Sequence, residues 1–261
     1  MDLSLYSKKA IIGGSTQGIG LAIAQELALA GADCILLSRN EESLKAAIAT
    51  LHTEGSQEHS YLVADFTNPD QLRSVIQEYV KTNTVEILIN NTGGPSPGLI
   101  AEEDEQKFIY TFQQHIVCNQ ILAKAIIPGM KQAGYGRIIN IISTSVKIPI
   151  ANLGVSNTIR AAVAAWAKTL SNEVGAFGIT VNSILPGNTW TNRLASVIKT
   201  NAERRAVSEE VIINEMKEKS PLKRFAEPKE IAAVAAFLAS PAAAYVNGVT
   251  IPVDGGATGT I

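Results

Sequence analysis

The feature that most constrains the fold is a regular alternation of short apolar runs with helix-forming stretches. Seven runs have the length and composition of buried strands: Ala10–Ile12, Cys34–Leu37, Tyr61–Ala64, Glu86–Ile89, Arg137–Ile142, Ile179–Ile184 and Val249–Val253. The stretches between them predict helices at Gly18–Ala30, Glu41–Leu51, Pro69–Val80, Glu103–Met130, Asn152–Phe177 and Pro228–Leu238. Such alternation is typical of right-handed βαβ units. We therefore predict an α/β fold with a doubly wound, parallel, seven-stranded sheet of Rossmann type.

One stretch interrupts this alternation. Asn188–Lys219 is polar and rich in charges, and it carries no strand signal. It follows the sixth predicted strand, whose carboxyl end borders the crevice where ligands bind in open α/β sheets. We expect a mobile flap over that crevice, within a single domain of residues 1–261, and an ordinary helical insertion is the alternative.

The clearest local signal is a glycine-rich turn between the first strand and the first helix. Gly14 permits the tight turn, Gly18 lets the backbone approach a pyrophosphate, and Gly20 allows the helix to pack closely on the strand. The helix N-terminus offers N–H groups and a positive dipole end to phosphates. A glycine pattern is a weak signal alone, but this one has the required strand–turn–helix context. The residues expected to contact a nicotinamide dinucleotide here are Gly14, Ser15, Thr16, Gln17, Gly18, Ile19 and Gly20.

The end of the second strand indicates which dinucleotide binds. An acidic residue there would accept hydrogen bonds from the ribose 2′-OH of NAD, whereas this chain has Arg39. A guanidinium group can pair with the 2′-phosphate of NADP, and Ser38 can donate a further hydrogen bond. We therefore predict NADP(H) as the cofactor. The alternative is that Arg39 is a solvated surface residue with no role in binding.

Composition excludes several other classes of protein. The net charge of −2 leaves no basic field for nucleic acid. No run approaches the roughly 18 apolar residues of a membrane span, so we expect no membrane partner. Cys34 and Cys118 read as small buried hydrophobic residues and make no disulfide framework. Met1–Ala10 lacks the apolar core of a signal peptide, so the default location is cytoplasmic.

Several motifs together resemble the short-chain dehydrogenase/reductase family. The turn has that family's glycine spacing, Asn90–Gly93 resembles its Asn-Asn-Ala-Gly with threonine for alanine, and Val253–Gly256 resembles the end of its ketoacyl-carrier-protein-reductase-like members. The resemblance covers nearly the whole chain. It implies further cofactor contacts at Asp65, Phe66, Asn91, Gly93, Pro186, Gly187 and Thr191.

The catalytic positions depart from the family pattern. The family uses a tyrosine to protonate the product, a lysine four residues later, a serine thirteen residues before the tyrosine, and an asparagine on the preceding long helix. Aligning the flanking segments places Ser143 at the serine position, Ser156 at the tyrosine, Arg160 at the lysine and His115 at the asparagine. Ser156 is a far weaker acid than tyrosine, and arginine releases no proton in proteins. Arg160 can still hold ribose hydroxyls or an anion.

Three functions are consistent with this pattern. The leading hypothesis is an NADP(H)-dependent oxidoreductase that acts on a carbonyl or enoyl substrate through an atypical site. In it, Ser143 holds the carbonyl, Arg160 stabilises negative charge, and His115 with water supplies the proton. The alternative is a catalytically silent NADP(H)-binding regulatory or partner subunit, with cofactor-independent lyase or dehalogenase chemistry in third place. We expect a small-molecule substrate, no metal, and a homotetramer or homodimer, with pairing to an active relative as a further option.

Overall fold

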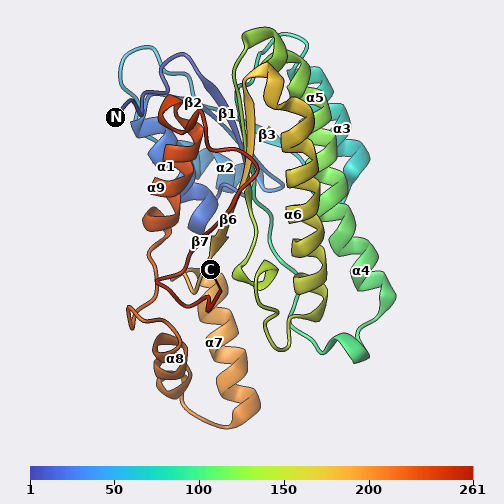
Figure 1. Cartoon of the computed structure of the whole chain (residues 1–261), viewed down its shortest axis with the longest axis vertical. Coiled ribbons are helices and arrows are strands. Elements are labelled where there is room, and N and C mark those ends of the chain that lie inside the picture. Colours follow the sequence, from blue (N-terminus) through green and yellow to red (C-terminus); the bar gives the residue numbers. More distant parts are fainter. Residues whose placement is uncertain (261) are drawn as a thin grey trace.

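A seven-stranded sheet forms the centre of the molecule (Figure 1). The computed structural model describes residues 1–260. All strand pairings are parallel, and the order is β3-β2-β1-β4-β5-β6-β7. The winding direction reverses between β1 and β4, which creates a crevice at the carboxyl ends of these strands. The predicted single-domain, doubly wound α/β fold is confirmed.

Each predicted strand and helix overlaps an observed element. The strands are β1 (Lys9–Gly13), β2 (Asp33–Ser38), β3 (Ser60–Val63), β4 (Ile87–Asn90), β5 (Gly136–Ile141), β6 (Ile179–Pro186) and β7 (Thr250–Val253). The α-helices are α1 (Gly18–Leu29), α2 (Glu41–Ile48), α3 (Pro69–Tyr79), α4 (Glu105–Phe112), α5 (Cys118–Ala133), α6 (Gly154–Val174), α7 (Asn192–Arg205), α8 (Glu209–Glu218) and α9 (Pro228–Ala239).

Helices cover both faces of the sheet. Figure 1 shows α1 and α9 beside each other on one side and α5 and α6 on the other. The neighbouring β2 residues Leu36 and Leu37 are both fully buried and belong to opposite core clusters. Successive strand side chains point to opposite faces, so a strand covered on both sides reads as a continuous apolar run. This is why the strands were detectable in the sequence.

The long helix predicted over Glu103–Met130 is present as a continuous helical stretch from Glu105 to Ala133, but it is not α-helical throughout. The helix is divided into α4 and α5 by a π-helical turn at Gln113–Val117. A π turn is wider than an α turn, and such turns occur frequently at functional sites. The apolar periodicity on either side does not reveal it. The wide turn contains His115, one of the four expected catalytic positions.

The polar insertion Asn188–Lys219 contains two helices, α7 and α8, which project beyond the end of the sheet in Figure 1. They share a small apolar cluster that includes Leu194, Ile198 and Ile212. Thr191 caps α7 by accepting a hydrogen bond from the Leu194 amide at 3.3 Å. The insertion is therefore helical, and its mobility as a flap stays a prediction.

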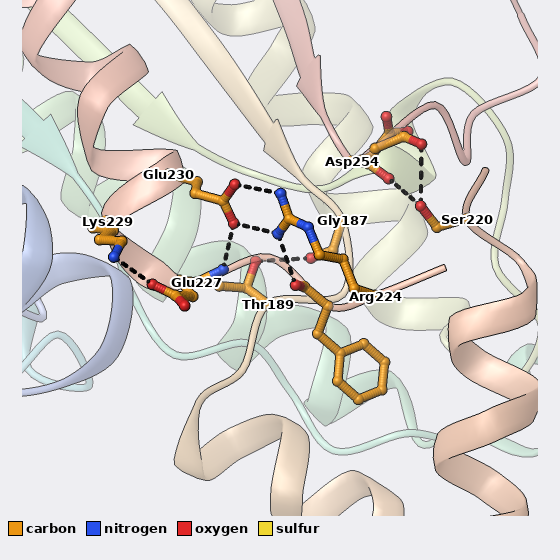
Figure 2. A network of polar contacts seen from close by, with 10 residues as sticks. Gly187, Thr189, Ser220, Arg224, Glu227, Lys229, Glu230 and Asp254 are labelled. Atoms are coloured by element: carbon orange, nitrogen blue, oxygen red, sulfur yellow. Dashed lines mark hydrogen bonds and ion pairs between the residues drawn. The ribbon is translucent and has the colours of Figure 1, made fainter. Parts of the chain in front are cut away.

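The segments that lead into and out of this insertion contact each other. Thr189 and Ala226 form a parallel bridge, and the Trp190 ring stacks on Phe225 with centroids 5.6 Å apart. Figure 2 shows the surrounding polar network, in which the Arg224 guanidinium makes a two-pronged contact with the Glu230 carboxylate at 2.6 Å. In the same view, Ser220 donates to backbone carbonyls at the C-terminal end of β7. These contacts hold the base of α7 and α8 against the sheet.

Three further observations concern the cysteines, membrane-spanning helices and clusters of metal-binding side chains. Cys34 and Cys118 are both free and buried, as the sequence indicated. Within residues 1–260, no helix is long and apolar enough to cross a membrane. Over the same residues, no cluster of three or more His, Cys, Asp and Glu side chains has the arrangement of a metal site.

Candidate active site

One large cleft lies where the strands end and the insertion begins. It has a volume of about 1170 Å³. The carboxyl ends of β1, β4, β5 and β6 border it, and α7 and α8 form its far wall. Ligands of open α/β sheets bind at this position, where the strand order reverses. The cleft is therefore the candidate active site.

The glycine turn forms one end of the cleft. Gly14 and Gly18 both have positive φ angles, +57° and +58° respectively, a conformation that costs other residues energy. A Cβ atom on Gly20 would lie 2.2 Å from the Gly14 carbonyl oxygen, so only glycine fits at that position. The Asn91 amide donates to the carbonyls of Gly13 at 3.0 Å and Gly14 at 3.3 Å, which fixes the turn against the end of β4.

The N-terminus of α1 opens into the same end of the cleft. Its first turn contains no acidic residue, and the side chain of Gln17 at the N-cap position does not cap the helix. The amides of this turn therefore keep their hydrogen-bonding capacity, and the helix dipole is uncompensated. Gln17 instead accepts a hydrogen bond from the Asn192 amide at 3.1 Å, which connects the turn to the start of α7. This arrangement suits a diphosphate group.

Arg39 and Ser38 line the cleft at the end of β2. Arg39 is exposed, and none of the ion pairs formed within the described chain, residues 1–260, includes it. A second hollow, of about 580 Å³, lies between Arg39, Asp65 and neighbouring polar residues. A guanidinium with no carboxylate partner beside a polar hollow fits a phosphate group. The residues at this end thus fit NADP(H).

Ser143 and Arg160 lie at the opposite end of the cleft. Ser143 follows β5, and its hydroxyl accepts a hydrogen bond from the Ser145 amide at 3.1 Å. The Arg160 side chain extends from α6 and donates from Nη1 to the Ile141 carbonyl at 2.7 Å, so it is fixed beside the end of β5. Burial and, secondarily, the positive charge of Arg193 lower the pKa of Arg160 to about 10. Arg160 therefore remains a cation at neutral pH.

His115 is enclosed behind the cleft wall. Its Nδ1 atom is 2.7 Å from the Thr92 hydroxyl, while Nε2 is buried without a partner among residues 1–260. Burial, followed by the charge of Arg160, lowers the pKa of His115 well below its ordinary value of 6.5. The imidazole is thus neutral at physiological pH. This state does not favour the expected role of His115 as a proton source.

Most of the expected site residues meet in this one cleft. It is lined by Gly14, Thr16, Gln17, Gly18, Ile19, Gly20, Ser38, Arg39, Asp65, Phe66, Asn91, Gly93, Ser143, Arg160, Pro186, Gly187 and Thr191. Three expected residues are not part of its lining, namely Ser15, Ser156 and His115. The Ser15 hydroxyl is buried and accepts from the Leu37 amide at 3.2 Å, so it supports the turn from behind. Ser156 is half-buried on α6, one turn before Arg160.

Sequence reasoning missed two residues that the structure brings to the site. Arg193 lines the cleft from the first turn of α7, and its Nη2 donates to the Pro95 carbonyl at 2.8 Å. A cation at this position opposes the helix dipole, which is a signal that the sequence did contain. Thr92 contacts His115, and both residues depart from the family pattern given above. The simultaneous change of both residue types from the family pattern is a signal that could have suggested this contact.

Known proteins match this chain over a range that includes all residues lining the cleft. A family model described as "Enoyl-(Acyl carrier protein) reductase" matches residues 14–258. The chain is 32% identical to a 3-oxoacyl-[acyl-carrier-protein] reductase of Vibrio cholerae, over 97% of this chain and 98% of the relative. It is 31% identical to an NADPH-dependent reductase of Bacillus subtilis, over 98% and 100% of the two chains. The crystal structure of L-sorbose reductase from Gluconobacter frateurii, complexed with NADPH and L-sorbose, superposes with a TM-score of 0.93 at 30% identity, covering 100% of both chains.

The fold and the cleft define the class of protein first. A parallel sheet with a glycine turn at its switch point, open to a cleft lined by Arg39, is a Rossmann-type dinucleotide-binding domain. Full-length matches to reductases then define the family. The chain belongs to the short-chain dehydrogenase/reductase family, and the relatives named above are reductases.

Proposed function

We propose that this protein is an NADP(H)-dependent oxidoreductase that reduces a carbonyl or conjugated enoyl group through an atypical catalytic site. The observation that carries the proposal is the continuity of the cleft from Arg39 through the glycine turn to Ser143 and Arg160. A dinucleotide that reaches from Arg39 along this cleft brings its nicotinamide end toward the two polar side chains. The NADPH-dependent relatives support the choice of cofactor.

The residues present fit the cofactor at each of its charged groups. The unpaired Arg39 guanidinium would hold the 2′-phosphate, with Ser38 beside it. The N-terminus of α1 would hold the diphosphate. Thr191 and the Pro186-Gly187 backbone, at the end of β6, would hold the nicotinamide carboxamide. When bound, NADPH supplies a hydride to the substrate.

Ser143 and Arg160 would act on the substrate oxygen. The Ser143 hydroxyl donates a hydrogen bond to the carbonyl oxygen, which orients the electrophilic carbon. As the carbonyl carbon gains a hydride, negative charge develops on that oxygen, and the nearby Arg160 cation stabilises it. Arg160 keeps its own proton, because its pKa of about 10 lies above the working pH. We propose that a water molecule in the cleft delivers the proton that completes the alcohol.

His115 would then be a positioning residue. Its hydrogen bond with Thr92 ties the π turn to the loop after β4, behind the wall that Gly93 and Gly94 form. A neutral imidazole adds no further positive charge next to Arg160. We therefore assign His115 to the shape of the cleft and leave proton delivery to water.

Two measurements test this function together. Fluorescence titration should show NADPH binding at least tenfold more tightly than NADH. Absorbance at the NADPH band should then fall with at least one class in a panel of ketones, ketoacyl thioesters and enoyl thioesters. NADH binding as tight as NADPH would refute the cofactor assignment, and tight NADPH binding without oxidation by any member of the panel would refute the reductase assignment.

A second function has one specific observation in its favour. Ser156 and His115 occupy two of the four family catalytic positions, yet neither lines the cleft. A catalytically silent subunit that binds NADP(H) and regulates an active relative would have such a site. Its test is the double variant Ser156→Tyr with Arg160→Lys. Ketone reduction by this variant, and none by the natural protein, would favour the silent subunit. Equal activity of both would contradict it.

We also propose that the protein is a homotetramer or homodimer. Helix α4 exposes Ile109, Tyr110 and Phe112, each more than 40% accessible in the isolated chain. Large apolar side chains gathered on one short helix are typical of an interface between chains. Light scattering coupled to size exclusion tests this directly, and Tyr110→Glu should shift the mass toward the monomer. A monomeric natural protein at micromolar concentration would refute the proposal.

A further inference from the structure

Two arginines from different helices meet beside one glycine in the cleft. Arg160 comes from α6 and Arg193 from α7. A methyl group built on Gly94 would lie 3.3 Å from Arg160 Nη2 and 3.4 Å from Arg193 Nη2. The two guanidinium groups therefore come together at one position on the face of Gly94. Both arginines line the cleft, so the position is accessible from it.

Neither guanidinium has a carboxylate partner. Over the described part of the chain, residues 1–260, no ion pair within 4.0 Å includes Arg160 or Arg193. Each donates one hydrogen bond to a backbone carbonyl, from Arg160 to Ile141 and from Arg193 to Pro95. Arg160 is only 9% exposed, and a buried charge without a counter-ion is costly. The protein thus maintains a buried cation that it does not neutralise itself.

The charged groups that meet beside Gly94 are both positive. Burial and the charge of Arg193 lower the pKa of Arg160, and both arginines contribute to the lowered pKa of His115. Arg193 also lies in the first turn of α7, where the helix dipole disfavours a cation, and that turn contains no acidic residue. The burial of Arg160, its repulsion by Arg193 and the unfavourable helix dipole at Arg193 therefore all disfavour the two cations. A bound anion would offset each of these effects.

We propose that Arg160 and Arg193 bind a carboxylate group of the substrate beside Gly94. This deepens the proposed reductase function and rests on it: the substrate class becomes a carboxylic acid that also carries the carbonyl or conjugated double bond to be reduced. A planar carboxylate matches the planar donor fork of a guanidinium group. The lining of the same cleft includes the apolar residues Ile148, Pro149 and Val197. An oxo acid with a short hydrocarbon skeleton fits these surroundings.

A second source of negative charge lies close by and must be separated from the substrate. The start of α7 contacts the glycine turn through Asn192 and Gln17. The diphosphate of the cofactor, which that turn would hold, would therefore be on the same side of the cleft as Arg193. Both sources offer an oxyanion to a guanidinium. Removal of Arg193 distinguishes them, because only one of the two ligands should then lose affinity.

The test measures carboxylate binding on the protein saturated with NADP⁺, by isothermal titration calorimetry. The probes are 2-oxobutanoate and 4-oxopentanoate, each beside its methyl ester. We expect at least one acid to bind tenfold or more tightly than its ester. Arg193→Gln should weaken that acid at least tenfold while it leaves the ester and NADPH dissociation constants within twofold. Lys199→Gln removes an exposed charge from the same helix outside the cleft lining and serves as the matched control.

A second variant tests the position and keeps both charges. Gly94→Ala places a methyl group in tight contact with both guanidinium nitrogens and should displace them, so it should also weaken the acid at least tenfold. The proposal is overturned if acids and esters bind alike, or if neither acid binds at 10 mM, which is about tenfold above a millimolar dissociation constant. It is also overturned if Arg193→Gln weakens NADPH binding while acid binding persists. NADPH oxidation is scored separately. Acids that bind without being reduced would leave the carboxylate site in place and show that these two acids are not substrates, while the reductase itself is tested by the wider panel.

Discussion

The buried His115 gives a pH dependence of stability whose sign and size follow from the structure. Its pKa is lowered in the folded protein, chiefly by burial and next by Arg160, whereas in the unfolded chain it has its ordinary value of 6.5. Below pH 6.5, and above the lowered folded-state pKa, the unfolded chain therefore binds a proton that the folded protein does not. The contribution of the neutral imidazole to the free energy of unfolding is therefore fully present above pH 6.5. It is lost as the pH falls from 6.5 toward the lowered pKa of the folded protein.

The expected loss is about 1.4 kcal/mol per pH unit in this window. Moving from pH 7.5 to pH 5.5 should thus lower the free energy of unfolding by about 1.4 kcal/mol through His115 alone, or the melting temperature by about 3–5 °C for a chain of this size. The perturbation is His115→Asn, which restores the residue type of the family pattern and removes the titrating group. Because other groups titrate equally in both proteins, the quantity of interest is the difference between their pH slopes.

Urea denaturation followed by circular dichroism, at several pH values between 7.5 and 5.5, measures this difference. The natural protein should lose about 1.4 kcal/mol more than His115→Asn over that interval. His52→Gln, which removes an exposed histidine, should retain the slope of the natural protein. Equal slopes for the natural protein and His115→Asn would refute the reasoning, because they would mean that His115 titrates normally in the folded state.

Three further predictions concern the dinucleotide site. Arg39→Gln should weaken NADPH binding by about 10- to 100-fold, the value of one charge-assisted hydrogen bond, and leave NADH unchanged; Arg73→Gln, an exposed arginine on α3, is the control for fluorescence titration. Gly20→Ala should abolish binding of both dinucleotides, because its Cβ would lie 2.2 Å from the Gly14 carbonyl oxygen; measurable tight binding would contradict the geometry of the turn. Asn91→Ala should weaken both dinucleotides about equally, by roughly tenfold, because two hydrogen bonds to the turn are lost; a change confined to NADPH would be inconsistent with that role.

Much of the fold could be predicted because its determinants are local. Leu36 and Leu37 make β2 apolar on both faces, which distinguishes a buried parallel strand from an exposed one. Gly14 and Gly20 mark the turn by backbone requirements that no other residue meets. For these features, the residue type and its neighbours in the sequence carry the physical cause. The right-handedness of βαβ connections then predicts a doubly wound sheet with helices on both faces.

The parts that escaped prediction depend on contacts between distant segments. The π turn at His115 leaves the apolar periodicity of α4 and α5 intact, so a continuous helix is the simpler interpretation of the sequence. The approach of Arg193 to Arg160 depends on how α7 folds back over the strand ends, which no local pattern encodes. Ser156 shares a helix with Arg160, yet only Arg160 is long enough to be part of the cleft lining.

The central claim is that this protein transfers hydride from NADPH although Ser156 and Arg160 are the residues predicted at the family's tyrosine and lysine positions. Deuterium transfer measures this most directly. The protein is incubated with NADPH deuterated at nicotinamide C4 and with the acid that binds most tightly, and the product is examined by mass spectrometry. We predict that deuterium appears on the reduced carbon of the product, and that Arg160→Gln lowers the rate at least 100-fold, equivalent to about 2.7 kcal/mol of transition-state stabilisation. Unlabelled substrate recovered intact beside bound, unoxidised NADPH would contradict the claim.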